Sequence, residues 1–148
     1  MLNKVRRLTS LTVLEQTLLL QLTVLSLGLR VALTIVTLPR LTALLVRNRP
    51  SPGLRRIPLL HTRCSVDQLI RLIDLATTVS HGEGRCLPRA LLLFWILRAR
   101  QESAELCLGV QTAKTRLHAH AWVEQDGVVV GDTRVFTDRY TPMLRFPT

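Results

Sequence analysis

Cys86 stands where a glycine-bearing loop meets the predicted start of a helix, a position that favours a reactive thiolate. The loop is His-Gly-Glu-Gly-Arg over residues 81–85, and Pro88 suits a first helical turn because its missing N–H costs nothing there. Unpaired N–H groups and the helix dipole at such a position lower the pKa of a thiol. Cys86 is therefore a candidate nucleophile, and a small buried hydrophobe is the alternative.

A candidate base lies in the run His-Ala-His-Ala-Trp-Val-Glu over residues 118–124. Its period of two predicts a strand with one face that carries the two histidines, the tryptophan and the glutamate. His120 is the candidate base. We rank His118 second, as a candidate substrate contact, and expect Trp122 to pack over the site, where it is also a candidate substrate contact.

The turn that follows this strand decides what lies opposite His120. A three-residue loop ending in a left-handed Gly127 would pair Glu124 with Val128 and set Asp132 opposite His120. A two-residue turn at Asp126-Gly127 would shift the register by one and put Asp132 on the other face. A catalytic role for Asp132 is expected to require the first register.

In that register the three residues could act as a triad. Asp132 would accept a hydrogen bond from one ring nitrogen of His120, which leaves the other nitrogen to exchange a proton with Cys86. The alternative is that His120 and Asp132 are ordinary surface residues of two strands.

For the elements that must position these residues, the sequence predicts helices first and an antiparallel sheet after them. Ser65 and Gln68 have capping-box spacing, and the apolar pattern beyond them predicts a helix to about Ser80. The helix headed by Cys86 is apolar on nearly every side, so it should be central and buried. Short β-type runs follow at residues 105–111, 118–124 and 128–132, and the predicted class is α+β.

We expect three parts along the chain: an apolar, basic helical segment over residues 1–46, a linker over 47–58 and a catalytic core over 59–148. The first part should form two amphipathic helices broken near Gly28 or Pro39. Its longest uncharged run, residues 16–29, falls short of the 18 to 20 or so residues that span a bilayer. Contact with a membrane surface is the alternative use of this segment.

Charge and cysteine content narrow the classes of function. The formal charge is +10, and residues 1–56 hold nine basic residues against one acidic residue. No motif interleaves aromatic and basic residues, so nucleic acid is not an expected partner. Three cysteines, an odd number without a signal peptide, argue against a disulfide framework and fit a reducing cytoplasm. Neither a structural metal nor a cofactor is expected, and Cys64 and Cys107 should be buried hydrophobes.

Four segments together resemble the stand-alone leader peptidases of lasso-peptide biosynthesis, which are transglutaminase-like and papain-like cysteine peptidases. They are Cys-Leu-Pro-Arg-Ala-Leu from residue 86, Cys-Leu-Gly-Val from 107, His-Ala-His-Ala-Trp-Val-Glu from 118 and Gly-Val-Val-Val-Gly-Asp from 127. The likeness covers about residues 57–135 in order and spacing. The N-terminal helices are similar in character alone.

The resemblance implies a cytosolic peptidase that removes the leader from a ribosomally made precursor before a separate ATP-dependent cyclase closes a macrolactam. It implies that Cys86 is the nucleophile, His120 the general base and Asp132 the orienting carboxylate. It also implies a separate leader-recognition protein as partner. Two alternatives stay open: an acyl-transferring transglutaminase-like enzyme, and a non-catalytic scaffold that binds a membrane surface or a partner.

Overall fold

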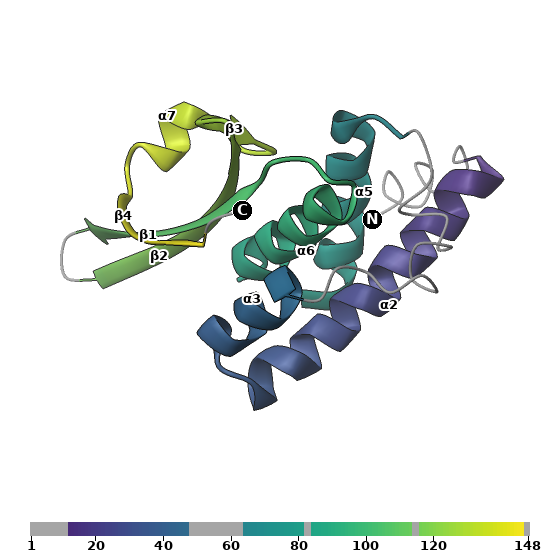
Figure 1. The fold of residues 1–148 in the computed structure, drawn as a ribbon, viewed down its shortest axis with the longest axis horizontal. Coiled ribbons are helices and arrows are strands. Elements are labelled where there is room, and N and C mark those ends of the chain that lie inside the picture. The colour runs from purple at the N-terminus through teal and green to yellow at the C-terminus, as the bar shows by residue number, and fades with distance from the viewer. Residues whose placement is uncertain (1–11, 48–63, 82–83, 114–115, 147–148) are drawn as a thin grey trace.

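The structure, a computed structural model, describes residues 12–47, 64–81, 84–113 and 116–146. Helices come first and a four-stranded antiparallel sheet follows, which confirms the predicted α+β class. The elements are α2 (Val13–Ile35), α3 (Leu38–Arg47), α5 (Val66–His81), α6 (Cys86–Ala99), β1 (Glu105–Ala113), β2 (Arg116–Gln125), β3 (Val128–Val130), α7 (Arg134–Thr137) and β4 (Thr141–Phe146). Helices α2, α3, α5 and α6 lie together on one side of the sheet, with α2 farthest from it, whereas α7 lies apart from them, near β3 (Figure 1).

Helix α6 is the centre of the core, as its all-round apolar sequence predicts. It packs on β1 and β2 on one side and on α2, α3 and α5 on the others. Its buried residues are Pro88, Ala90, Leu91, Leu92, Leu93, Phe94, Ile96 and Leu97. The core therefore fixes α6, and with it Cys86, against the sheet.

Helix α2 packs along α5 and shares the same core. Leu18 and Leu22 are buried, and the hydroxyl groups of Ser26 and Ser80 lie 2.7 Å apart. The helix runs straight through Gly28 and ends at Ile35, so the predicted break lies before Pro39. Residues 48–58 of the predicted linker lie outside the described residues.

By length and composition alone, α2 is apolar enough to cross a membrane. Its polar side chains nevertheless bind α5. Arg30 Nη1 donates to the carbonyl oxygen of Ser80 at 2.7 Å, and Gln68 Nε2 donates to Glu15 Oε1 at 2.7 Å. These contacts make α2 part of the folded domain.

The helix starts show which capping signals the structure uses. Ser65 Oγ accepts from the backbone N–H of Gln68 at 3.2 Å, but the side chain of Gln68 reaches Glu15 on α2. The complete reciprocal capping box lies at the start of α2, where Thr12 and Glu15 each accept from the other's backbone N–H. Only the first half of the predicted box at Ser65 is therefore formed.

Of the two registers that the sequence allows for the hairpin between β2 and β3, the structure has the second, and not the one that a catalytic role for Asp132 was expected to require. Glu124 pairs with Val129 and Gln125 with Val128, so Asp126 and Gly127 form a two-residue turn. Both have positive φ, 49° and 79°, as the tight turns that match the twist of a hairpin require. The ladder ends at Val130, which leaves Gly131 and Asp132 outside it.

The strand order is β3-β2-β1-β4, and the two elements described beyond Asp132, α7 and β4, were not predicted from the sequence. Strand β4 completes the sheet beside β1, with an irregularity in the pairing between Leu108 and Gly109. The short helix α7 connects Asp132 to β4. The sequence of neither element has a strong apolar period. In β4 this agrees with the structure, in which the strand is exposed over most of its length.

Gly109 makes room for Trp122 on the sheet. It pairs with His120 in the ladder, and a Cβ atom there would lie 2.9 Å from both the Thr141 carbonyl oxygen and Trp122 Cη2. We expect Gly109→Ala to lower the free energy of unfolding by about 1–3 kcal/mol, measured by urea denaturation, because neither backbone nor buried ring can yield easily.

Gly28→Ala is the matched control for this substitution. A Cβ atom at Gly28 would meet nothing within 4 Å, and alanine is the better residue inside a helix. This variant should gain up to about 1 kcal/mol of stability. Equal stabilities for the two variants would contradict the packing argument.

Candidate active site

Cys86 is the first residue of α6 and is partly accessible, whereas Cys64 and Cys107 are buried. The residue before it, Arg85, gives no side-chain cap to the helix. The first intrahelical hydrogen bond of the described turn runs from the Arg89 N–H to the Arg85 carbonyl at 3.0 Å, and Pro88 has no N–H. The N–H groups of Cys86 and Leu87 are thus left at the helix start, close to the thiol.

His120 and Asp132 form a direct pair. His120 Nε2 lies 2.7 Å from Asp132 Oδ2, and the side chains are only 13% and 16% exposed. The other carboxylate oxygen, Oδ1, accepts from the backbone N–H of Thr133 at 2.8 Å. Because Asp132 binds Nε2, the Nδ1 atom is the ring nitrogen left to interact with Cys86.

This pair forms although the register that was expected to be necessary for it is absent. Gly131, directly after β3, has φ of 76°, so the chain turns out of the strand direction before Asp132. A strand continued in the observed register would set residue 132 opposite Ala121, on the wrong face. The left-handed bend at Gly131 returns the carboxylate to His120.

The thiol and the imidazole shift each other's pKa. The pKa of Cys86 is lowered, chiefly by its hydrogen bond with His120, against the opposing effect of burial; the backbone N–H groups of Ala121 and Leu87 add to the lowering. Burial lowers the pKa of His120, but its hydrogen bonds with Cys86 and Asp132 outweigh it and the net shift is upward. Both directions favour a thiolate beside an imidazolium.

Three aromatic rings surround the imidazole. Trp122 is stacked with its centroid 6.1 Å from that of His120, while Phe136 and Tyr140 each lie at 5.0 Å. Trp122 is buried, as expected, and its Nε1 donates to Glu124 Oε1 at 2.9 Å. Phe136 and Tyr140 were not predicted to lie at the site, because they follow Asp132 in a segment without a regular sequence pattern.

His118 is exposed on β2 and pairs in the ladder with Gln111, whereas the contacts with Cys86 and Asp132 belong to His120. Glu124 receives a structural explanation: it holds the indole of Trp122 through Oε1 and accepts from Arg145 at 2.7 Å through Oε2. The motif over residues 118–124 thus supplies the stacked rings of His120 and Trp122 and the Glu124 carboxylate that orients the indole.

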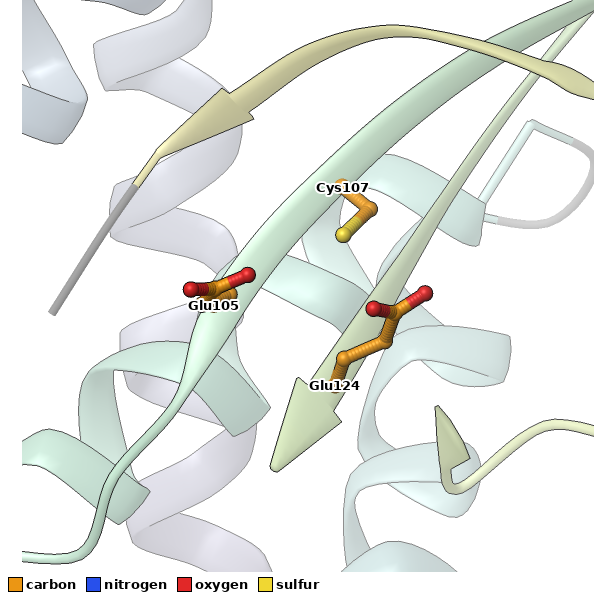
Figure 2. A group of neighbouring side chains, drawn as sticks. All are labelled: Glu105, Cys107 and Glu124. Carbon is orange, nitrogen blue, oxygen red and sulfur yellow. The ribbon is translucent and has the colours of Figure 1, made fainter. Parts of the chain in front are cut away.

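A cluster of candidate metal ligands lies near this motif. The ligand atoms of Glu105, Cys107 and Glu124 all lie within 4.8 Å of one another, on the neighbouring strands β1 and β2 (Figure 2). Burial, as the largest cause, and the nearby carboxylate of Glu124 raise the pKa of Cys107 to about 11, so its thiol stays protonated at neutral pH. Arg145 pairs with both carboxylates. The guanidinium already offsets their charge, and we assign the cluster a structural role.

The fold and the site define an α+β protein in which a helix headed by a cysteine lies beside a histidine on an antiparallel sheet and an aspartate just after one of its strands. A family model described as the transglutaminase-like superfamily matches residues 25–145. The chain belongs to this superfamily, whose members are usually cysteine-dependent enzymes. No curated protein and no solved structure matches the chain.

Proposed function

We propose that this protein is a cytoplasmic cysteine peptidase that removes the leader from a ribosomally made lasso precursor peptide. The observation that carries the proposal is the hydrogen-bonded His120–Asp132 pair beside the partly accessible thiol of Cys86. Family membership supports a cysteine-dependent reaction. The likeness of the four sequence segments to leader peptidases supports the choice of substrate.

In the proposed reaction the Cys86 thiolate attacks the scissile carbonyl carbon while the carbonyl electron pair moves onto oxygen. The N–H groups of Cys86 and Leu87 at the helix start are the candidate donors to that oxyanion. The His120 imidazolium gives its proton to the leaving amine, which frees the core peptide and leaves the leader as a thioester on Cys86. Asp132 holds the imidazole so that Nδ1 faces sulfur.

Water completes the cycle. His120, now neutral, takes a proton from a water molecule that attacks the thioester, and the leader departs with a free carboxylate as the thiolate re-forms. An amine in place of this water would yield an amide and make the protein an acyl transferase. The two outcomes share every residue of the site, so the product distinguishes them.

The proposal includes a separate leader-recognition protein and a later cyclase as partners. Exposed apolar side chains on α2 support a docking role for the N-terminal helices. They are Val13, Leu14, Leu20, Val24, Leu27, Val31 and Ile35. Peripheral contact with a membrane is the other use of this face, and a cleavage assay with and without the recognition protein separates the two.

The test is to incubate the full chain with a lasso precursor and its recognition protein and to identify the products by mass spectrometry. We expect one cut at the leader–core boundary, with a free carboxylate on the leader. A repeat in excess primary amine should leave hydrolysis dominant. A leader that carries the amine as its main product would assign acyl transfer, and an intact precursor would contradict the proposed function.

A further inference from the structure

Arg89 lies one helical turn after Cys86 on α6, and its guanidinium binds two other parts of the fold at once. Nε donates to Asp74 Oδ1 on α5, and Nη2 donates to the backbone carbonyl oxygen of Gly131. Nη2 also lies 3.4 Å from Asp74 Oδ2. The side chain, only 19% exposed, thus connects the helix of the candidate nucleophile to the residue that precedes Asp132.

We infer that Arg89 is a positioning residue that holds the bend at Gly131, and through it the His120–Asp132 pair, in place relative to Cys86. This inference rests on the proposed function, in which those three side chains react together. It assigns Arg89 no contact with substrate.

The bend needs such support because the sheet does not hold it. The β2–β3 ladder ends at Val130, so no pairing in the ladder fixes the peptide between Gly131 and Asp132. The left-handed φ at Gly131 is one of several conformations open to a glycine. A charged donor on the Gly131 carbonyl selects the orientation of that peptide and so the direction in which Asp132 leaves it.

Packing around Gly131 supports the same point. A Cβ atom at Gly131 would lie 3.1 Å from Leu93 Cδ2 and 3.3 Å from Ile70 Cγ1. The bend therefore rests directly on α5 and α6, at the height of the Arg89–Asp74 pair. The two helices, the bend and the arginine form one contiguous contact between the helical half and the sheet half of the site.

The geometry of the guanidinium matters more than its charge. Arginine presents several N–H donors in a rigid plane, so one side chain can bind Asp74 and the Gly131 carbonyl together. A lysine keeps the charge but offers a single flexible ammonium group. Comparison of Arg89→Lys with Arg89→Met therefore separates positioning from a general electrostatic effect on the thiolate.

The experiment measures alkylation of Cys86 by iodoacetamide against pH and cleavage kinetics of the precursor in the same variants. We expect Arg89→Met to lower kcat about 10- to 100-fold with little change in KM, since small misplacements of reacting groups cost this much. The Cys86 alkylation rate at pH 7 should fall about 5- to 10-fold, because a displaced His120 stabilises the thiolate less. Mass spectrometry of the Cys86 peptide assigns the modification.

Chemical rescue adds a readout that a merely structural role would not give. Arg89, Asp74 and Gly131 line an open cleft of about 670 Å³ that also reaches Asp132. Guanidinium ions at millimolar concentration should enter the space left in Arg89→Ala and raise its alkylation rate and kcat at least about threefold, whereas tetramethylammonium, which has no N–H donor, should not.

Two further variants and a control complete the design. Arg89→Lys should stay impaired, and Asp74→Asn should show a smaller loss because it removes the partner that orients the arginine. Arg98→Met is the control: it changes an arginine in the last turn of α6 that lies over Phe94 at 5.7 Å. It should leave the alkylation profile unchanged.

A wild-type alkylation profile in folded Arg89→Met, or full activity in Arg89→Lys, would overturn the inference. If Arg89→Met does not fold, an unchanged profile in Asp74→Asn has the same consequence. Alkylation needs no precursor, so it tests the positioning even if the wild-type protein fails to cut the peptide. Failure of the proposed function and failure of this inference therefore give different results.

Discussion

Replacing Cys86 by alanine is expected to abolish processing of the precursor, with kcat reduced at least about 10⁴-fold. The sulfur of Cys86 is the only atom of the proposed site that forms a covalent bond to the substrate carbonyl carbon, so its removal leaves no route through an acyl-enzyme. Cys86 is partly accessible at a helix start, so the change should cost little stability. Rates are measured by mass spectrometry of precursor and products.

Cys64→Ala is the matched control for this prediction. Cys64 is buried, and its sulfur donates to the Ser65 carbonyl rather than to any candidate catalytic residue. It should keep near wild-type kcat. Binding of the recognition protein and the unfolding transition must be retained in Cys86→Ala for the comparison to hold. Processing that persists in that variant would exclude Cys86 as the nucleophile and end the cysteine-peptidase assignment.

The second large effect is expected from His120→Asn, which should lower kcat about 10³- to 10⁴-fold and also change the pH dependence of the thiol. In the wild-type protein the hydrogen bond from His120 lowers the pKa of Cys86. Alkylation requires the thiolate, so its rate should rise with pH at a midpoint below that of an ordinary cysteine. Without the imidazole, the midpoint should move upward, because burial then opposes ionisation with less compensation.

His118→Asn provides a control on the same strand. His118 is exposed and two residues from His120, so the change alters a histidine without touching the pair with Asp132. Its alkylation profile should match the wild-type profile. A raised KM at constant kcat would identify His118 as a substrate contact. An alkylation midpoint that is the same in His120→Asn and in wild type would contradict the assigned pairing of thiol and imidazole.

These effects depend on a site that joins two halves of the fold. Cys86 belongs to the helical half, whereas His120 lies on β2 and Asp132 follows the end of β3. Arg89 and the glycine at 131 are where the halves meet beside the site. Core substitutions that tilt α6 on β2 should therefore reduce activity before they unfold the protein, since reacting groups tolerate less displacement than a core does.

The sequence by itself determined the helices before residue 100, the first three strands and the three candidate residues. Helix α6 was predictable because its residues are apolar all round, which suits only the centre of a core. The alternation over residues 118–124 similarly specified a strand with His120 and Trp122 on one face. Local signals without a strong period failed: β4 and α7 were missed, and the full capping box formed at Thr12 rather than at Ser65.

Only the tertiary structure decided how Asp132 reaches His120. The residues of the turn allowed two registers, and the one observed is the register from which a straight strand would carry Asp132 away. The Asp132 carboxylate returns to His120 because Gly131 adopts a left-handed bend. This bend packs against Ile70 and Leu93, and the Gly131 carbonyl oxygen accepts a hydrogen bond from Arg89. Those contacts join segments about 40 to 60 residues apart. A pattern of neighbouring residues holds no information about them, because a glycine's choice among its backbone conformations is made by what packs against it.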